Sequence, residues 1–216
     1  MSELDLLASV DGDEVVALGE GAVLLRRFVG EASPALGADI ADVAAAAPFR
    51  RMLTPGGFRM SVAMTNCGAY GWVSSEHGYR YAPVDPVSGL PWPSMPASFF
   101  ELARCAAERA GFPGFEPDAC LINRYEPGAR LSLHQDKDES DFDAPIVSVS
   151  LGAPAVFLFG GEKRKSPPAR VPLEHGDVVV WGGPARLRFH GVAPLKAGWH
   201  PFASSHRLNL TLRRAR

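Results

Sequence analysis

Hydrophobic and polar positions change their pattern near residue 118, and the change divides the chain into a mixed first half and a strand-rich second half. Before that point, the Ala-rich segment 31–47 and the segment 98–110 carry apolar residues at helical spacing, which predicts two helices. After it, short apolar or alternating runs are separated by turns that contain Gly and Pro, a pattern typical of strands. We expect these strands at 119–125, 129–134, 146–151, 155–159, 170–173, 178–181, 188–192 and 207–213.

Short strands separated by such turns predict a double-stranded β-helix, or jelly roll, in a mainly β (α+β) protein. A chain of 216 residues favours one domain. We expect a loosely ordered acidic lead at 1–20, a supporting strand and helix at 21–47, a segment rich in Gly and Pro at 48–95, and a support helix with the jelly roll at 96–216. The capping-box spacing of Ser98 and Glu101 predicts that the support helix begins at Ser98.

Composition says more about where in the cell the protein is expected than about any reaction it catalyses. The formal net charge is -2, so nucleic acid has to bind through a local basic patch rather than a global field. Three cysteines are too few and too scattered for a disulfide framework or a zinc site, which favours a reducing, cytoplasmic location. The N-terminus lacks a signal-peptide pattern and no apolar run is long enough to span a bilayer, so we expect no membrane association. We expect a monomer at this size.

Two histidines and one aspartate form the strongest candidate for chemistry. His134 and Asp136 are two apart in a strand-like run, so their side chains are expected to point to the same face. His190 lies far downstream in a second strand-like run, and a jelly roll can return it to the first. Two His and one carboxylate can occupy one triangular face of a metal and leave other positions open, as in non-haem Fe(II) oxygenases. A single histidine is more often a surface or core residue, so the metal hypothesis depends on this distal partner.

The final predicted strand carries an unusual polar face. Arg207, Asn209 and Arg213 alternate with leucines, so all three point the same way. Buried guanidinium groups need an anionic partner, and Arg binds carboxylates through two N–H groups at once. A small dicarboxylate fits this requirement, whereas a solvated face on an exposed edge strand is the alternative. Asn123 and Tyr125 share one face of another strand and are candidates to bind the same dicarboxylate.

Together these motifs resemble the AlkB family of 2-oxoglutarate- and Fe(II)-dependent nucleic-acid dealkylases. The resemblance runs from about residue 20 to residue 213. It rests in particular on Thr54-Pro-Gly-Gly57, Asp118-Ala-Cys-Leu-Ile-Asn-Arg-Tyr125, Leu131-Ser-Leu-His-Gln-Asp-Lys-Asp138 and Arg207-x-Asn-x-Thr-x-Arg213. The metal triad alone indicates only the oxygenase superfamily, whereas the last run is far more specific to AlkB-like enzymes. In that family, residues 48–95 would form a nucleotide-recognition lid.

The resemblance implies a role for each candidate residue. Iron would be held by His134, Asp136 and His190, which with Arg213 make up the expected catalytic set. The co-substrate 2-oxoglutarate would be bound by Asn123, Arg124, Tyr125, Arg207, Asn209 and Arg213. The damaged base would be bound by Trp72, Tyr79, Asp138 and Arg164. Trp72 would serve as a stacking platform, and Asp138 would favour the positive charge of a ring-methylated base.

The implied reaction removes N-methyl groups from bases such as 1-methyladenine and 3-methylcytosine in single-stranded DNA. It consumes O₂, decarboxylates 2-oxoglutarate to succinate and releases formaldehyde. RNA and double-stranded DNA are alternative substrates. Two other functions stay open: a 2-oxoglutarate-dependent hydroxylase of a protein or small molecule, and a non-catalytic nucleic-acid-binding module. The lid motifs argue against the first, and the complete triad with both arginines argues against the second.

Overall fold

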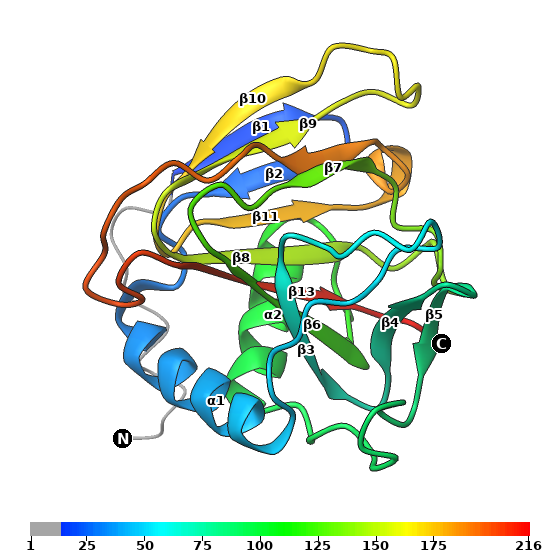
Figure 1. Cartoon of the computed structure of the whole chain (residues 1–216). Helices are drawn as coiled ribbons and strands as arrows, with labels where there is room; N and C mark the ends of the chain where they lie inside the picture. The colour runs from blue at the N-terminus through cyan, green and yellow to red at the C-terminus, as the bar shows by residue number, and fades with distance from the viewer. Residues whose placement is uncertain (1–13) are drawn as a thin grey trace.

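Two antiparallel sheets face each other in the computed structural model, which describes residues 14–216 (Figure 1). The larger sheet has seven strands in the order β1-β2-β11-β8-β13-β6-β3, and the smaller has four in the order β10-β9-β12-β7. Strands of the larger sheet are β1 (Val15–Gly19), β2 (Ala22–Leu25), β3 (Ala63–Gly68), β6 (Ala119–Tyr125), β8 (Ile146–Gly152), β11 (Val178–Trp181) and β13 (Arg207–Arg213). Those of the smaller are β7 (Leu131–His134), β9 (Ala155–Phe159), β10 (Ala169–Leu173) and β12 (His190–Val192).

Apolar side chains fill the space between the sheets at one end of this sandwich. Phe157 and Phe159 of β9 pack with Trp181 of β11, their ring centroids 5.9 and 6.4 Å from the indole. At the other end, the inward positions of β6 and β13 are polar, and they surround the candidate site described below. The fold is therefore the predicted jelly roll, with an apolar core at one end and a buried polar cluster at the other.

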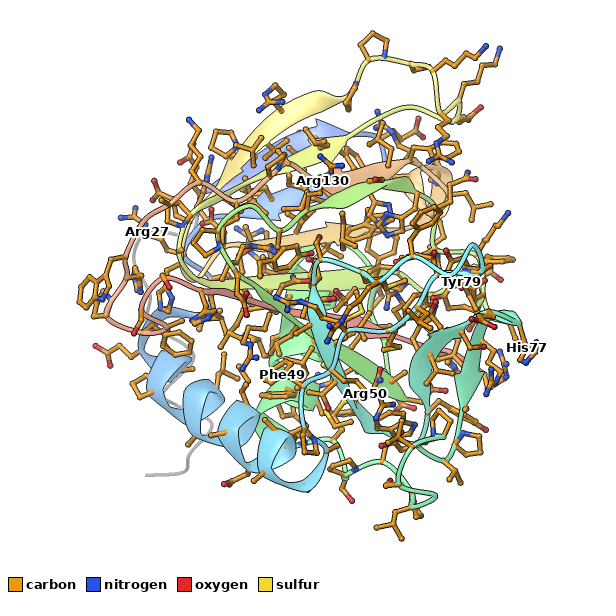
Figure 2. The ribbon with its side chains drawn as sticks, in the orientation of Figure 1. Arg27, Phe49, Arg50, His77, Tyr79 and Arg130 are labelled. Atoms are coloured by element: carbon orange, nitrogen blue, oxygen red, sulfur yellow. The ribbon has the colours of Figure 1, made fainter. Side chains whose placement is uncertain are left out.

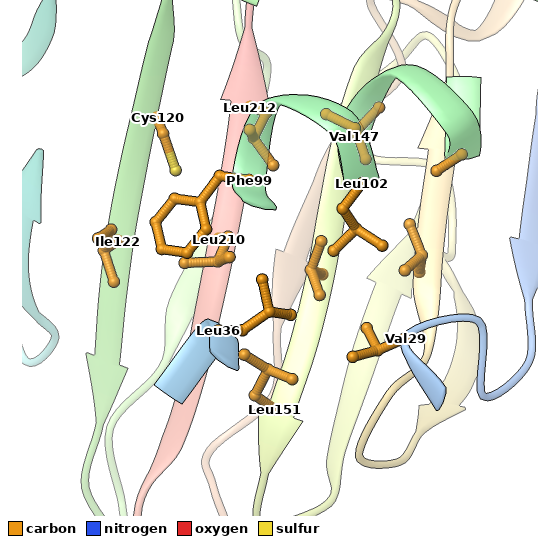
Figure 3. Packing of buried hydrophobic residues seen from close by; sticks show 14 of the residues in the cluster. Val29, Leu36, Phe99, Leu102, Cys120, Ile122, Val147, Leu151, Leu210 and Leu212 are labelled. Atoms are coloured by element: carbon orange, nitrogen blue, oxygen red, sulfur yellow. The ribbon is translucent and has the colours of Figure 1, made fainter. Parts of the chain in front are cut away.

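Two helices cover the outer face of the larger sheet (Figures 1 and 3). They are α1 (Ser33–Ala46) and α2 (Ala97–Arg109). Leu36 of α1 and Phe99 of α2 are buried against Ile122 of β6 and Leu210 of β13. Strand β13 therefore has apolar side chains under the helices and polar side chains facing the smaller sheet, as its alternating sequence requires.

A separate hairpin projects beside the sandwich, within the segment expected as a lid (Figure 1). It consists of β4 (Gly71–Ser75) and β5 (Gly78–Ala82). Gly71 begins it under the buried Trp92, where an added Cβ would lie 2.3 Å from the indole. Only glycine fits so close an approach, and the hairpin is fixed to the body at this point.

Several sequence predictions need correction. The expected loosely ordered lead at 1–20 contains strand β1, which pairs with β2 and forms one edge of the larger sheet. The rest of that expectation, at residues 1–13, lies outside the described residues. The expected capping box is wrong: Pro96 is the N-cap of α2, and the Ser98 hydroxyl donates to the carboxylate of Asp39 on α1. The strand expected at 188–192 is shorter, and the one expected at 129–134 begins at Leu131.

The described helices do not include one that is both long and apolar enough to cross a membrane.

Candidate iron and 2-oxoglutarate site

The two candidate histidines are brought together by strand pairing. Strands β7 and β12 are antiparallel neighbours, and His134 is the register partner of His190. Their ring centroids are 4.4 Å apart. Gly191 permits this close pairing, because an added Cβ would lie 2.6 Å from the carbonyl oxygen of Leu131. Asp136 lies two residues beyond the end of β7, so it reaches the same place from the loop and not, as predicted, from the strand.

Backbone carbonyl groups orient both imidazole rings. Nδ1 of His134 is 2.8 Å from the carbonyl oxygen of Ser132, and Nδ1 of His190 is 3.1 Å from that of Arg188. A carbonyl oxygen can only accept, so each Nδ1 carries a proton, and in the neutral ring this leaves the Nε2 lone pair free for a metal. These Nε2 atoms lie 3.6 and 3.7 Å from the carboxylate oxygens of Asp136. Outer hydrogen bonds of this kind are typical of metal-binding histidines.

Arg213 holds the carboxylate of Asp136 in place. Its Nε and Nη2 atoms lie 2.9 and 2.5 Å from Oδ2 of Asp136. Burial raises the pKa of the Asp136 carboxyl, but the Arg213 guanidinium and then His190 outweigh it and hold the pKa well below its ordinary value. Asp136 is therefore ionised, with Oδ2 bound to Arg213 and Oδ1 turned towards His134.

The geometry and charge of this triad fit a divalent metal. His134, Asp136 and His190 each offer one ligand atom, and these atoms lie within 4.8 Å of one another. Burial, followed by neighbouring His190, lowers the pKa of His134 to about 4, so the ring is neutral at pH 7 and available as a ligand. The His134 side chain is 39% exposed and that of His190 is buried, so the site is open on the His134 side. Two imidazoles and one carboxylate suit Fe(II).

A second polar cluster lies on the inner face of β6 and β13. Arg207 is 1% exposed and its Nη2 donates to Ser150 Oγ at 2.7 Å. Within residues 14–216, its Nε and Nη1 atoms have no hydrogen-bond partner, nor do the Tyr125 hydroxyl and the Asn123 side-chain oxygen. Burial raises the pKa of Tyr125 to about 12, so its hydroxyl stays protonated and can donate. A buried cation beside an unused donor fits a carboxylate ligand, because it would otherwise be very costly.

Asn209 and Arg124 differ from the other expected 2-oxoglutarate residues. Asn209 faces the cluster, but its side chain is saturated: it donates to Ser148 and accepts from Asn123 Nδ2 at 3.2 Å. It therefore positions Asn123. Arg124 points to the opposite face of β6, where its guanidinium lies 4.7 Å from the ring centroid of Phe49. Strand alternation excludes its side chain from the face of Asn123 and Tyr125, so the structure does not support this assignment.

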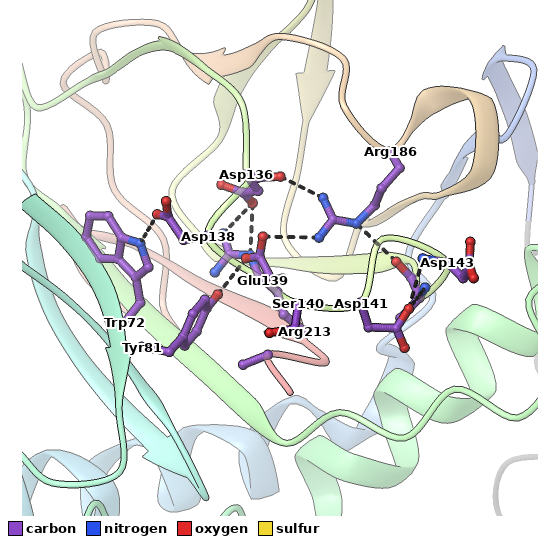
Figure 4. Close-up of polar contacts among 12 residues, drawn as sticks. Trp72, Tyr81, Asp136, Asp138, Glu139, Ser140, Asp141, Asp143, Arg186 and Arg213 are labelled. Carbon is purple, nitrogen blue, oxygen red and sulfur yellow. Dashed lines mark hydrogen bonds and ion pairs between the residues drawn. The ribbon is translucent and has the colours of Figure 1, made fainter.

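Sequence reasoning missed a buried carboxylate next to the triad. Oε1 of Glu139 accepts from the Tyr81 hydroxyl at 2.7 Å and lies 3.4 Å from Arg213 Nε, and Oε2 lies 3.2 Å from Arg186 Nη2 (Figure 4). Arg186 also donates to the backbone carbonyl of Asp136 at 2.8 Å. Glu139 thus connects the β4–β5 hairpin to the metal loop, the segment 135–138 that carries Asp136. Tyr81 could have been found from the sequence, because it is two residues from Tyr79 on one strand and so faces the same side. Arg186 lies on an irregular turn, where no periodic pattern predicts the direction of its side chain.

The predicted substrate residues are only partly brought together. Trp72 Nε1 donates to Oδ2 of Asp138 at 2.9 Å (Figure 4), and its ring stacks on Tyr79 with centroids 5.3 Å apart. Tyr79 lies at the outer side of the hairpin and is 46% exposed (Figure 2). Arg164 is exposed in the loop between β9 and β10, away from the hairpin sheet in sequence and in contacts. An aromatic pair anchored by the Asp138 carboxylate therefore lies beside the loop that carries Asp136 (Figure 4).

Comparisons with known proteins agree with this geometry. A family model described as the 2OG-Fe(II) oxygenase superfamily matches residues 21–213. The chain is 60% identical to the alpha-ketoglutarate-dependent dioxygenase AlkB of Escherichia coli, over 98% of both chains. It is 47% identical to the AlkB homolog of Caulobacter vibrioides, over 79% of this chain and 76% of the relative. The solved structure of OsALKBH1 covers 93% of the chain, with a TM-score of 0.83 and 30% identity.

The fold, the triad and the buried arginine define an Fe(II)- and 2-oxoglutarate-dependent dioxygenase. The chain belongs to the 2OG-Fe(II) oxygenase superfamily and, within it, to the AlkB family. Its cofactor is Fe(II), and its co-substrates are 2-oxoglutarate and O₂.

Proposed function

We propose that the protein removes methyl groups from ring nitrogens of bases in nucleic acid, with single-stranded DNA as its main substrate. The carrying observation is the Trp72–Asp138 hydrogen bond, which holds an aromatic ring next to a carboxylate two residues along the chain from Asp136 (Figure 4). An extruded base needs both a stacking surface and a polar group at its edge. The names of the relatives support the same class of substrate, since they include DNA N(6)-methyladenine demethylases of Arabidopsis thaliana and a tRNA demethylase of Schizosaccharomyces pombe.

Each part of the site has a distinct task in this reaction. His134, Asp136 and His190 hold iron, and Arg213 keeps the Asp136 carboxylate turned towards it. Arg207 and Tyr125 bind the distal carboxylate of 2-oxoglutarate, and Asn209 holds Asn123 beside them. With both groups and O₂ bound, the site supplies oxidative decarboxylation and hydroxylation of the methyl carbon, and the resulting hydroxymethyl group leaves as formaldehyde. The protein itself orients the reactants and excludes water.

Selectivity for damaged bases follows from charge at the lid. A base methylated at a pairing nitrogen, such as 1-methyladenine or 3-methylcytosine, is cationic, whereas the normal base is neutral. Asp138 attracts the cation, and the faces of Trp72 and Tyr79 favour it further. Trp72 keeps the carboxylate in position through its indole N–H. Arg164, on the exposed β9–β10 loop, contributes to phosphate binding in this proposal.

A formaldehyde assay across methylated oligonucleotides tests the proposal. The panel contains 1-methyladenine or 3-methylcytosine in single-stranded DNA, double-stranded DNA and RNA, with an unmethylated strand as control. We expect formaldehyde and succinate in equal amounts from methylated single-stranded DNA, and none when a chelator removes iron. Decarboxylation of 2-oxoglutarate without formaldehyde from any strand would instead favour a hydroxylase of a protein or small molecule.

A further inference from the structure

A pocket beside the triad has no role in the reaction described so far. It lies between the loop that follows β7 and the turn at 183–187, and its volume is about 380 Å³, within the range of small-ligand sites. Phe142 and Leu187 line it and are 42% and 41% exposed. Gln135, which separates two of the triad residues, donates to the Leu187 carbonyl at 2.6 Å and ties the two walls together. The pocket therefore adjoins the metal site, because Gln135 lines it and lies between the metal ligands His134 and Asp136 in the chain.

The chemistry of this pocket suits an uncharged, planar group. Arg186 lines it, but Glu139 and the backbone carbonyls of Asp136 and Ala144 already engage this guanidinium. The same guanidinium lies 5.4 Å from the ring centroid of Phe142, so the ring is supported by a fixed cation. Glu162 adds a negative charge to the lining. The Glu162 carboxylate would repel a phosphate, and the pocket offers the phosphate no free cation. An amino group on a ring could instead donate a hydrogen bond to this carboxylate.

Apart from Arg186, whose charge Glu139 engages, the basic residues near this pocket directly follow its lining residues or its loop in the chain. Lys137 is exposed directly after the metal ligand Asp136. Lys163, Arg164 and Lys165 are exposed directly after Glu162. Exposed cations beside a pocket that contains an aromatic ring are an arrangement that can bind one base of a single strand while holding its flanking phosphates.

We propose that this pocket, the Phe142 pocket, binds the base next to the methylated nucleotide in the same strand, by stacking on Phe142. The inference rests on the proposed nucleic-acid substrate and deepens it, because it adds a second base contact outside the reacting centre. It predicts that the enzyme recognises the adjoining base as well as the damaged one, and that a strand lacking the adjoining base binds more weakly.

A cycle that combines protein variants with abasic strands tests this directly. Binding of a methylated five-nucleotide strand is measured by fluorescence anisotropy, without oxygen, on protein loaded with Fe(II) and 2-oxoglutarate. The strand is compared with versions that lack the base on the 5′ or the 3′ side. For the wild type, we expect one of these versions to bind at least about 5-fold more weakly, the lower end of the effect of base stacking on an aromatic ring. In Phe142→Ala, that penalty should fall below about 2-fold.

Matched variants keep the test decisive. Phe142→Trp should retain the abasic penalty, and Trp199→Ala, which removes a 70% exposed aromatic residue outside the pocket, should leave it unchanged. An equal penalty in the wild type and Phe142→Ala, or no penalty for either abasic strand, would overturn the Phe142 pocket. Formaldehyde release is followed separately on the same strands. Its absence alongside an intact binding pattern would reject the demethylase function and leave the pocket standing.

Discussion

Arg213 binds the carboxylate of Asp136 through two nitrogens, at 2.9 and 2.5 Å, from 77 residues further along the chain. The contact leaves one carboxylate oxygen facing His134 and ties the metal loop to the last strand of the larger sheet. It also separates the roles of two arginines on one strand face. Arg213 has carboxylate partners within the protein, whereas Arg207 has none among the described residues.

Arg213→Met should weaken iron binding by about 10- to 100-fold, the usual effect of losing a group that orients a metal ligand. The Asp136 carboxylate would lose its fixed direction and a buried counter-charge. Anaerobic titration with Fe(II) measures the affinity. Arg214→Met is the matched control, because Arg214 is a neighbouring, 47% exposed residue that lies 3.6 Å from Asp141. Iron affinity equal to that of the wild type in Arg213→Met would contradict this role.

Arg207→Met should reduce affinity for 2-oxoglutarate at least about 30-fold, because a buried charge pair would be lost. It should not destabilise the protein free of co-substrate, since removing an unpaired buried charge is neutral or stabilising. Thermal unfolding with and without 2-oxoglutarate reads both effects. The role of Arg207 would be contradicted if 2-oxoglutarate still stabilised the variant as much as it stabilises the wild type. It would also be contradicted if the melting temperature of the variant without ligand fell sharply.

Trp72→Ala should raise KM for a methylated oligonucleotide about 5- to 100-fold, within the range for a lost base-stacking contact. Binding of iron and 2-oxoglutarate should stay close to that of the wild type, because the indole N–H of Trp72 binds Asp138, which belongs to neither set of residues. Steady-state formaldehyde release and a 2-oxoglutarate titration separate the two effects. A comparable loss of all three affinities would make Trp72 a structural residue of the hairpin.

Lowering the pH should reduce the free energy of unfolding partly through His175, which lies outside the iron and 2-oxoglutarate site. Its Nδ1 accepts from the backbone N–H of Gly152 at 2.9 Å, and its ring stacks on His200. Burial, and then the charge of His200, lowers the pKa of His175. The unfolded chain therefore binds the proton more readily, so this contribution to stability is complete above about pH 6.5 and is lost as the pH falls below it.

Chemical denaturation between pH 8 and pH 5 measures this effect. The decrease in unfolding free energy below pH 6.5 should be smaller in His175→Asn than in the wild type. His77→Asn, which alters an exposed histidine of the hairpin turn, should follow the wild-type curve. Identical pH profiles for His175→Asn and the wild type would show that another group causes the loss.

The strands of the jelly roll could be predicted because their side chains alternate around sharp turns. The polar face of β13 is visible in its sequence, and the same alternation gives it buried leucines on the helix side. Strand β1 escaped prediction because its burial is partial and, within residues 14–216, it pairs with β2 alone. Local pattern also misled at Ser98, where a tertiary hydrogen bond to Asp39 replaced the expected cap.

The site was predictable to the extent that its residues lie on strands. His134 and His190 meet through antiparallel register, which follows from the fold. Arg124 was misplaced because motif membership ignored the alternation of faces on β6. The Glu139 cluster could not be derived from the sequence, because Tyr81, Arg186 and Arg213 reach it from three distant segments.

Iron stoichiometry in Asp136→Ala is the most direct test of the central claim. Under anaerobic conditions the wild type should bind one Fe(II) per chain and, once O₂ is admitted, release formaldehyde from methylated single-stranded DNA. Asp136→Ala should bind iron at least about 10-fold more weakly and release none, whereas Asp138→Asn, altered two residues further on, should keep wild-type iron binding. Wild-type iron affinity together with formaldehyde release by Asp136→Ala would contradict the assignment of this triad.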